Sequence, residues 1–285
     1  MIGPSSKMPR DPLSVLPMLR DQVRRLERPA ATAHGVLPFG AAAIDRALPG
    51  GGLARGALHE VLGAGGDGED GALAAAFVAG ILARLVTAVD GIVLWCLARP
   101  DLHGAGLAAC GLDPARLMLV RTARDSELLW AMEEGLRTSG VAAVVGEVGA
   151  FPAVASRRLQ LAAERSGVTA FVLRRWCNGG QAARERNLPN AAATRWQIAA
   201  LPSRPVTRFR EGGDSRAGSG IGHPCWRVEL LRCRGGEPAG WDVEVREGKM
   251  VDATDIVSLA EALADRPMAP GGGDTSPPEA IRRVG

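Results

Sequence analysis

The chain has 285 residues, 46% of them hydrophobic, and a formal net charge of +3. This length and composition predict one large folded domain with terminal tails rather than two domains. The sequence has neither an apolar run near the length of a membrane span nor a signal-like N-terminus, which predicts a cytoplasmic protein with no membrane partner. Its five cysteines, an odd number without a C-x-x-C pair, favour buried thiols and argue against a metal site.

Positive charge is concentrated in one part of the sequence. Between Phe151 and Arg216 there are twelve Arg against four acidic residues, so this stretch carries about +8 and the rest of the chain about −5. Such asymmetry is typical of proteins that bind a polyanion. A solvated arginine-rich face, in a protein that hardly uses Lys, explains the same charge equally well.

The N-terminal segment predicts an amphipathic helix over residues 11–28, in which apolar residues recur at helical spacing. We expect this helix to cap the domain or to contact a partner. The candidate partner contacts are Leu16, Leu19, Val23 and Leu26. The predicted organisation is a helix and linker over residues 1–34, a core domain over 35–252, and a short helix with a disordered tail over 253–285.

The core begins with a short helix over residues 41–48, a glycine turn and a strand over 57–62. Apolar strands and longer helices then alternate along the chain. The strands are expected at 92–98, 117–122, 141–145 and 169–176, and the helices at 72–86, 102–110, 125–139 and 152–166. Continuous apolar strands separated by helices predict a parallel sheet covered by helices on both faces.

The pattern changes after Trp176. Polar loops are expected at 177–194 and 202–223, and strands at 195–201, 226–233 and 241–250. Strands joined by short turns pair antiparallel. The predicted fold is therefore α/β, with a mostly parallel sheet, helices on both faces and an antiparallel extension at the C-terminal end.

The segment GAGGDGEDGAL, residues 63–73, lies where a nucleotide-binding protein has its phosphate loop. Gly63 and Gly68 have the Walker A spacing, but Glu69 and Asp70 replace the Lys and the hydroxyl residue. A carboxylate ~4 Å from a phosphate charge costs on the order of 4 kcal/mol at an effective dielectric of ~20. The loop should therefore not bind ATP through the usual contacts. The same letters fit the dinucleotide pattern G-x-G-x-x-G, but the strand over 92–98 is not followed by the ribose-binding acid that such a site needs.

Two longer stretches resemble the RecA family. PFGAAAIDRALPGGGLARGALHEVLG resembles the run that leads into the Walker A loop, and GLDPARLMLVRTARDSELLWAMEEGLRTSGVAAVVGEVGAF resembles the run through Walker B. The similarity spans about residues 35–248 and implies a RecA-like core. In this resemblance Gly146 occupies the position of the Walker B Asp, Glu147 follows it, and the catalytic Glu after the strand over 92–98 is missing. It therefore implies a protein that is not an enzyme and holds no cofactor.

A RecA-like chain of this size with a degenerate nucleotide site resembles the ImuA family, which is grouped loosely with SulA-like sequences. The resemblance implies a non-catalytic accessory protein of translesion DNA synthesis in the SOS response. Its implied partners are an ImuB-type Y-family polymerase homologue and, indirectly, an error-prone replicative-type DNA polymerase, with RecA and single-stranded DNA as further candidates. The alternatives are a DNA-dependent ATPase with an unconventional site and a SulA-like inhibitor of cell division.

RecA-family proteins contact DNA through two loops, whose counterparts here are residues 149–158 and 177–194. Arginines on such loops suit contacts with phosphates. The candidate DNA-binding residues are Arg157, Arg158, Arg174, Arg175, Arg184, Arg186 and Asn187. Most of the tryptophans in or at the ends of strands are expected to pack in the core, and Trp130, in the middle of a helix, is expected to be buried as well. The six tryptophans are Trp95, Trp130, Trp176, Trp196, Trp226 and Trp241.

Overall fold

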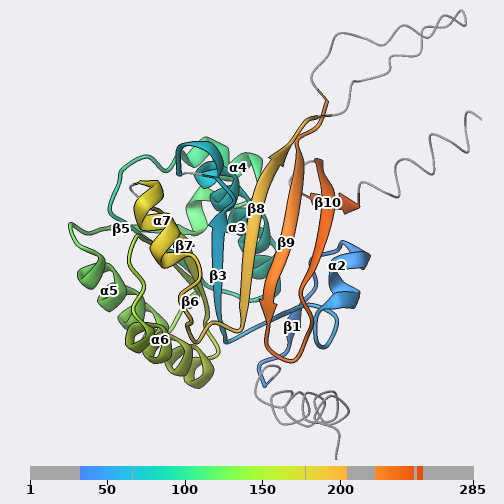
Figure 1. Ribbon diagram of the computed structural model, residues 1–285. Helices are drawn as coiled ribbons and strands as arrows, with labels where there is room; N and C mark the ends of the chain where they lie inside the picture. The colour runs from blue at the N-terminus through green and yellow to red at the C-terminus, as the bar shows by residue number, and fades with distance from the viewer. Residues whose placement is uncertain (1–32, 66, 177, 204–221, 247–248, 253–285) are drawn as a thin grey trace, which may run out of the picture. The chain divides into compact units, whose positions relative to one another are not determined.

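The protein was analysed as a computed structural model, which describes residues 33–65, 67–176, 178–203, 222–246 and 249–252. The predicted helix over 11–28, the tail over 253–285 and most of the loop over 202–223 lie outside these residues. The predicted α/β fold is confirmed: nine strands form one mostly parallel sheet with helices on both faces and an antiparallel C-terminal extension (Figure 1). This arrangement is consistent with a RecA-like core.

The sheet has the strand order β11-β10-β9-β8-β3-β7-β6-β4-β5. Its parallel strands are β3 (Leu58–Gly63), β4 (Ile92–Leu97), β5 (Leu117–Arg121), β6 (Val141–Val148), β7 (Thr169–Arg174) and β8 (Thr194–Leu201). The antiparallel strands are β9 (Cys225–Cys233), β10 (Ala239–Arg246) and β11 (Lys249–Asp252). Because β3 lies between β7 and β8, the loop that follows it starts near the middle of the sheet.

Helices cover the two faces of the parallel part in pairs (Figure 1). One face carries α3 (Asp67–Ala88) and α4 (Gly104–Ala109), and the other carries α5 (Asp125–Arg137) and α6 (Ala153–Ser166). On β6, Val145 faces α3 while Val144 faces α5. This alternation explains the continuous apolar strands, since both faces of the sheet are buried.

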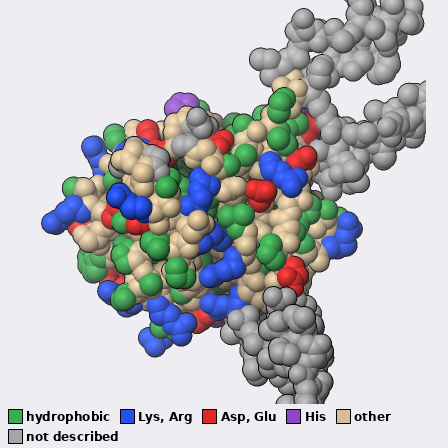
Figure 2. Space-filling view, viewed as in Figure 1, with side chains coloured by type: hydrophobic (Ala, Val, Ile, Leu, Met, Phe, Trp, Pro, Cys, Tyr) green, Lys and Arg blue, Asp and Glu red, His purple; other side chains and the backbone are tan. Residues whose placement is uncertain are grey.

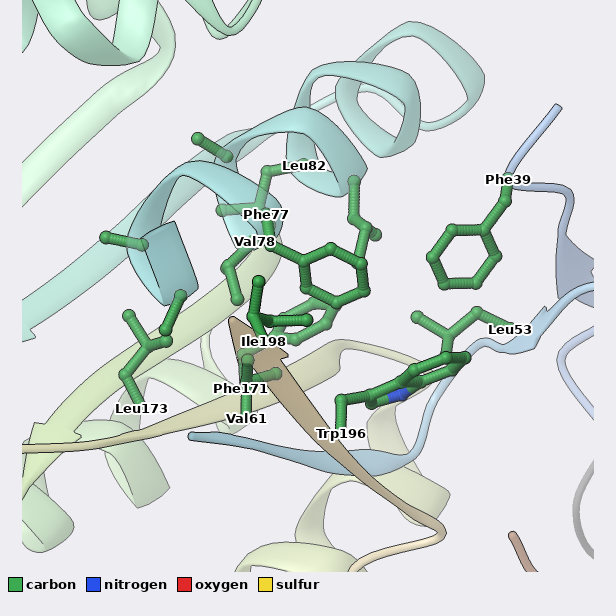
Figure 3. Close-up of a cluster of buried hydrophobic side chains, with 14 of the residues drawn as sticks. Phe39, Leu53, Val61, Phe77, Val78, Leu82, Phe171, Leu173, Trp196 and Ile198 are labelled. Carbon is green, nitrogen blue, oxygen red and sulfur yellow. The ribbon is translucent and has the colours of Figure 1, made fainter. Parts of the chain in front are cut away.

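The largest side chains of the α3 face pack together in an aromatic cluster (Figure 3). The Trp196 ring centroid lies 5.3 Å from that of Phe39 and 5.7 Å from that of Phe77. These rings come from the residues just before α2, from α3 and from β8, so the cluster ties the start of the core domain to the middle of the sheet. The adjoining α2 (Ala42–Ala47) buries Ile44 in the same core and contacts β10.

The helix α3 is long and apolar enough, by length and composition, to span a membrane. The sequence-based expectation that no such run exists was therefore wrong. In the folded chain Phe77, Val78, Leu82 and Leu85 of this helix are fully buried or nearly so in the core. Its apolar composition is thus explained by packing between the sheet and its neighbours.

Several elements differ from the predicted ones. The single strand expected over 241–250 is two antiparallel strands, β10 and β11. The helix α3 begins at Asp67, five residues before the predicted start, and α7 (Gly179–Glu185) lies within the predicted loop 177–194. The short strands β1 (Val36–Leu37) and β2 (Leu53–Ala54) pair with each other, and η1 (Pro114–Arg116) precedes β5. Short elements of this kind carry too few residues for a periodic pattern.

Candidate functional site

The candidate site lies at the carboxyl edge of the parallel strands, where α/β proteins usually bind ligands. The glycine loop, residues 63–70, runs there from the last residue of β3 into the first turn of α3. Gly68 and Glu69 lie in the first turn of α3, and a Cβ atom added to Gly68 would meet open space. A Cβ at Gly63, in contrast, would lie 2.7 Å from the Cβ of Asp70. Gly63 is therefore needed because the helix returns so close to the strand.

The Asp70 carboxylate is hydrogen-bonded to the backbone of the glycine loop. Asp70 is only 7% exposed, and its Oδ2 accepts a hydrogen bond of 2.6 Å from the backbone N–H of Gly65. Its Oδ1 accepts a longer hydrogen bond, 3.4 Å, from the N–H of Ala200 at the end of β8. In a working phosphate loop such N–H groups point at the phosphates. Here a carboxylate of the chain itself holds this place.

Arg186 binds the backbone carbonyl groups of the same loop. Its guanidinium donates hydrogen bonds to the carbonyl oxygens of Ala64, at 2.8 Å, and Gly63, at 3.3 Å. It also donates to Gln197 on β8 and lies 5.2 Å from the centroid of the Trp176 ring. The side chain predicted to contact DNA therefore has a structural role in this conformation, because it fixes the shape of the glycine loop.

Beside the loop, three carboxylates surround one guanidinium; we call this group the Arg175 cluster. Arg175 forms ion pairs with Asp67 at the start of α3, with Asp101 after β4 at 2.6 Å, and with Glu147 on β6 at 2.8 Å. The second oxygen of Glu147 accepts a hydrogen bond of 2.8 Å from the indole N–H of Trp95. Sequence reasoning missed Asp67 and Asp101, although both follow the carboxyl ends of parallel strands.

The electrostatics of the Arg175 cluster follow from its burial. Burial raises the pKa of Glu147 above its usual range, while the Arg175 charge and the Trp95 hydrogen bond act in the opposite direction. Burial lowers the pKa of Arg175, but hydrogen bonds to Asp101 and Asp67 outweigh this effect and raise it overall. Arg99 forms a second ion pair with Asp67. Three carboxylates against two guanidinium groups leave a net charge of −1 beside the glycine loop.

Gly146 is the residue that the RecA resemblance places at the Walker B Asp position, and it lies directly under α5. A Cβ added to Gly146 would overlap the Sδ atom of Met132 and lie 2.8 Å from Cδ2 of Leu128, both buried on α5. The helix α5 thus packs directly on the backbone of β6 at this point. A side chain at Gly146 would force Met132 and Leu128 out of their places, and a charged side chain would also have to be buried without a partner.

A cavity of about 290 Å³ lies between α3 and α4, next to the Arg175 cluster. Asp67, Asp101 and Arg175 line its polar side, and alanines of α3 with Leu107 of α4 line the rest. Within the described part of the chain, no group of three or more His, Cys, Asp or Glu side chains is arranged to hold a metal ion.

Comparison with known proteins gives a close relative. Protein ImuA of Caulobacter vibrioides strain NA1000 / CB15N is 40% identical over 262 residues, which cover 91% of this chain and the full length of that protein. The chain belongs to the ImuA family. Protein ImuA of Caulobacter vibrioides strain ATCC 19089 / CIP 103742 / CB 15 gives the same values. No protein-family model matches the chain.

The ImuA-family chain buries one of its predicted DNA-binding residues. The Arg174 side chain is only 1% exposed and forms ion pairs with Glu60, at 3.1 Å, and Glu185, at 2.9 Å. Glu60 is in turn paired with Arg195, and Phe151 and Trp176 lie against the Arg174 guanidinium. In this conformation Arg174 and the residue after it, Arg175, are held in ion pairs with carboxylates of the chain itself, so the predicted contact of either residue with DNA would require these pairs to break.

The other predicted contacts of the ImuA-family chain are more accessible. Arg157 and Arg158 lie on α6, not on a loop, and Arg158 forms an ion pair with Glu133 of α5. Arg184 and Asn187 are exposed at α7 and just after it. The leucines and valine predicted to contact a partner belong to the N-terminal segment, which lies outside the described residues.

Proposed function

We propose that this protein is a non-catalytic, RecA-like accessory protein of damage-inducible mutagenesis, and that its former nucleotide site serves as scaffold. The observation that carries the proposal is the hydrogen bond from Gly65 to the Asp70 carboxylate, inside the loop where a phosphate would bind. Membership of the ImuA family supports the assignment to mutagenesis. The role is that of an adaptor in translesion DNA synthesis during the SOS response.

Several independent features oppose ATP binding. A phosphate in the glycine loop would have to displace Asp70, and it would approach the net negative Arg175 cluster. A single carboxylate ~4 Å from a phosphate charge costs on the order of 4 kcal/mol at an effective dielectric of ~20. Gly146 offers no carboxylate at the position that the resemblance assigns to Mg²⁺, and a side chain added there would overlap Met132. Loss at all these places fits a scaffold better than an ATPase.

The proposed partners follow from the family resemblance. We assign the protein to the cytoplasm, where it would join an ImuB-type Y-family polymerase homologue to an error-prone replicative-type polymerase. The apolar face of the predicted N-terminal helix is the proposed contact for the polymerase-like partner. RecA and single-stranded DNA are further proposed ligands, for which the exposed Arg157, Arg184 and Asn187 are available.

Calorimetric titration of the full chain with Mg²⁺-ATP tests the proposal. We expect no saturable heat, and no ATP hydrolysis with or without single-stranded DNA. The matched variant is Gly68→Val, whose added side chain points into open space and should leave the fold intact. Micromolar ATP binding that this variant abolishes would overturn the proposal and favour the DNA-dependent ATPase. Co-purification with a cell-division protein, rather than with a polymerase-like one, would favour the SulA-like alternative.

A further inference from the structure

Trp130 is exposed, although its position in the middle of a helix predicted that it would be buried. All six tryptophans lie in the described ranges, and Trp130 is 63% exposed, whereas Trp95, Trp176, Trp196 and Trp226 are buried. The chain has no Tyr and only five Phe, so aromatic surface is scarce. An exposed indole in such a protein offers a flat face for stacking or for a partner's apolar group.

Trp130 lies on α5 beside a groove lined by arginines. The helices α5 and α6 lie side by side and pack against each other (Figure 1). A depression of about 430 Å³ lies between them. Arg137, Arg158 and Arg165 line this depression together with Leu161. Glu133 of α5 also lines the depression. Trp130 comes three residues before Glu133, so it lies about one helical turn, ~5 Å, from Glu133 along the axis of α5.

The arginines of this groove are held in place by a buried acid. The side chain of Glu133 is 8% exposed and forms ion pairs with both Arg137 of α5 and Arg158 of α6. Arg165 has no hydrogen bond or ion pair among the described residues. The lining of the depression therefore holds three arginines against one acid, Glu133, which is a net charge of +2. Arg158 and Arg137 are thus positioned before any ligand arrives.

Figure 2 shows Lys and Arg side chains, with apolar side chains between them, over the region that α5 and α6 occupy in Figure 1. Val154, at the start of α6, is 74% exposed. Proteins that bind single strands combine a positively charged groove with aromatic side chains on which bases stack. A duplex hides its base faces inside the stack, so an exposed indole beside the groove favours a single strand.

We propose that the α5–α6 face binds single-stranded DNA without reading its sequence, with one base stacked on Trp130 and the neighbouring phosphates held by Arg158, Arg137 and Arg165. Positive charge and an aromatic face suit every base equally, since each base has a π-face. The surface is separate from the glycine loop and from α7. The inference rests on the proposed function only in taking single-stranded DNA as a ligand, and it needs no nucleotide site.

The test is fluorescence anisotropy of a labelled oligo(dT) titrated with the full chain. Trp130→Ala should weaken binding about 5-fold or more, because an aromatic platform is lost. With unlabelled oligo(dT), the wild type should show quenching of tryptophan emission. Trp130→Phe should keep most of the affinity but lose this quenching. Because Trp130 is largely exposed, both variants should unfold at the wild-type temperature.

A second pair of variants tests the phosphate contacts. Arg165→Ala should reduce the slope of log K against log salt concentration by about 0.7, the value for one phosphate of a single strand. The matched control is Arg46→Ala on α2, an exposed arginine that likewise has no partner among the described residues and lies by β10. This control should leave the slope unchanged.

Wild-type affinity in both Trp130→Ala and Arg165→Ala would overturn the proposal and indicate that the α5–α6 face contacts a protein. An equal loss in Arg46→Ala would reduce the effect to net charge and would overturn it as well. Calorimetry with ATP on the same preparations separates the two hypotheses. ATP binding would contradict the proposed function but not the DNA-binding surface. Unchanged DNA binding in the variants would contradict the DNA-binding surface but not the proposed function.

Discussion

The Arg175 cluster allows a prediction whose size follows from the structure. In Arg175→Met, two of the three carboxylates lose little. The Asp101 side chain, already 48% exposed, can be solvated at small cost, and Asp67 keeps its ion pair with Arg99. Glu147 is different, because its side chain is 3% exposed and keeps only the Trp95 hydrogen bond. Removing one partner of a buried pair costs about 3–5 kcal/mol. At about 2–4 °C per kcal/mol for a chain of this size, the melting temperature should fall by about 10 °C.

The loss should depend on pH, and its sign follows from Glu147. Burial already raises the pKa of this carboxyl, and removing the Arg175 charge raises it further. Between the unfolded and folded pKa values, the folded chain binds a proton that the unfolded chain does not. The free energy of unfolding of Arg175→Met therefore falls as pH rises through this window. The variant should lose less stability at about pH 5 than at about pH 7.5.

Urea unfolding followed by tryptophan fluorescence at both pH values measures this prediction. Glu147→Gln added to Arg175→Met should recover part of the loss, because the neutral amide still accepts the Trp95 hydrogen bond. The matched control, Arg184→Met on α7, removes an exposed arginine and should change stability by no more than about 0.5 kcal/mol. A loss below about 1 kcal/mol in Arg175→Met, or equal losses at the two pH values, would refute the electrostatic account of the cluster.

Three further predictions concern the sheet and the glycine loop. Gly146→Ala should cost about 1–3 kcal/mol in urea unfolding, since its methyl group overlaps Met132, and a loss below about 0.5 kcal/mol would mean that this core can yield. Burial lowers the pKa of His59 to about 4 from 6.5, so stability should fall by about 3 kcal/mol as pH drops through this range, and His59→Gln should lack that slope. Asp70→Ala should cost about 1–3 kcal/mol and speed hydrogen exchange at the N–H of Gly65; unchanged exchange would count against the hydrogen bond.

Much of the fold was accessible from local patterns. The alternation of apolar strands and helices predicted the parallel sheet, and the short turns after Trp176 predicted its antiparallel extension. These patterns work because a strand buried on both faces must be apolar throughout, and a covering helix must be apolar on one side. The sequence also showed directly that Glu69 and Asp70 stand where the Walker A pattern has Lys and a hydroxyl residue, because residue type needs no structure.

Surface and partner assignments were less accessible. Trp130 and Arg174 illustrate this, since an exposed tryptophan and a buried arginine both reverse the usual preference of their residue type. Arg174 is buried because Glu60 and Glu185 meet it from other strands and helices, residues that are distant or unremarked in the sequence. Arginine count alone therefore overstated the positive surface around α7.

The sequence by itself determined the architecture of this protein, its family resemblance and the acidic residues of the glycine loop, because each depends on residue type and on spacing along the chain. Only the tertiary structure decided how the charged groups at this edge of the sheet are paired. Asp70 reaches back to the N–H of Gly65, and Arg175 gathers carboxylates from α3, from the segment after β4 and from β6. Such contacts join residues up to about a hundred positions apart, and only chain folding brings them within hydrogen-bonding distance.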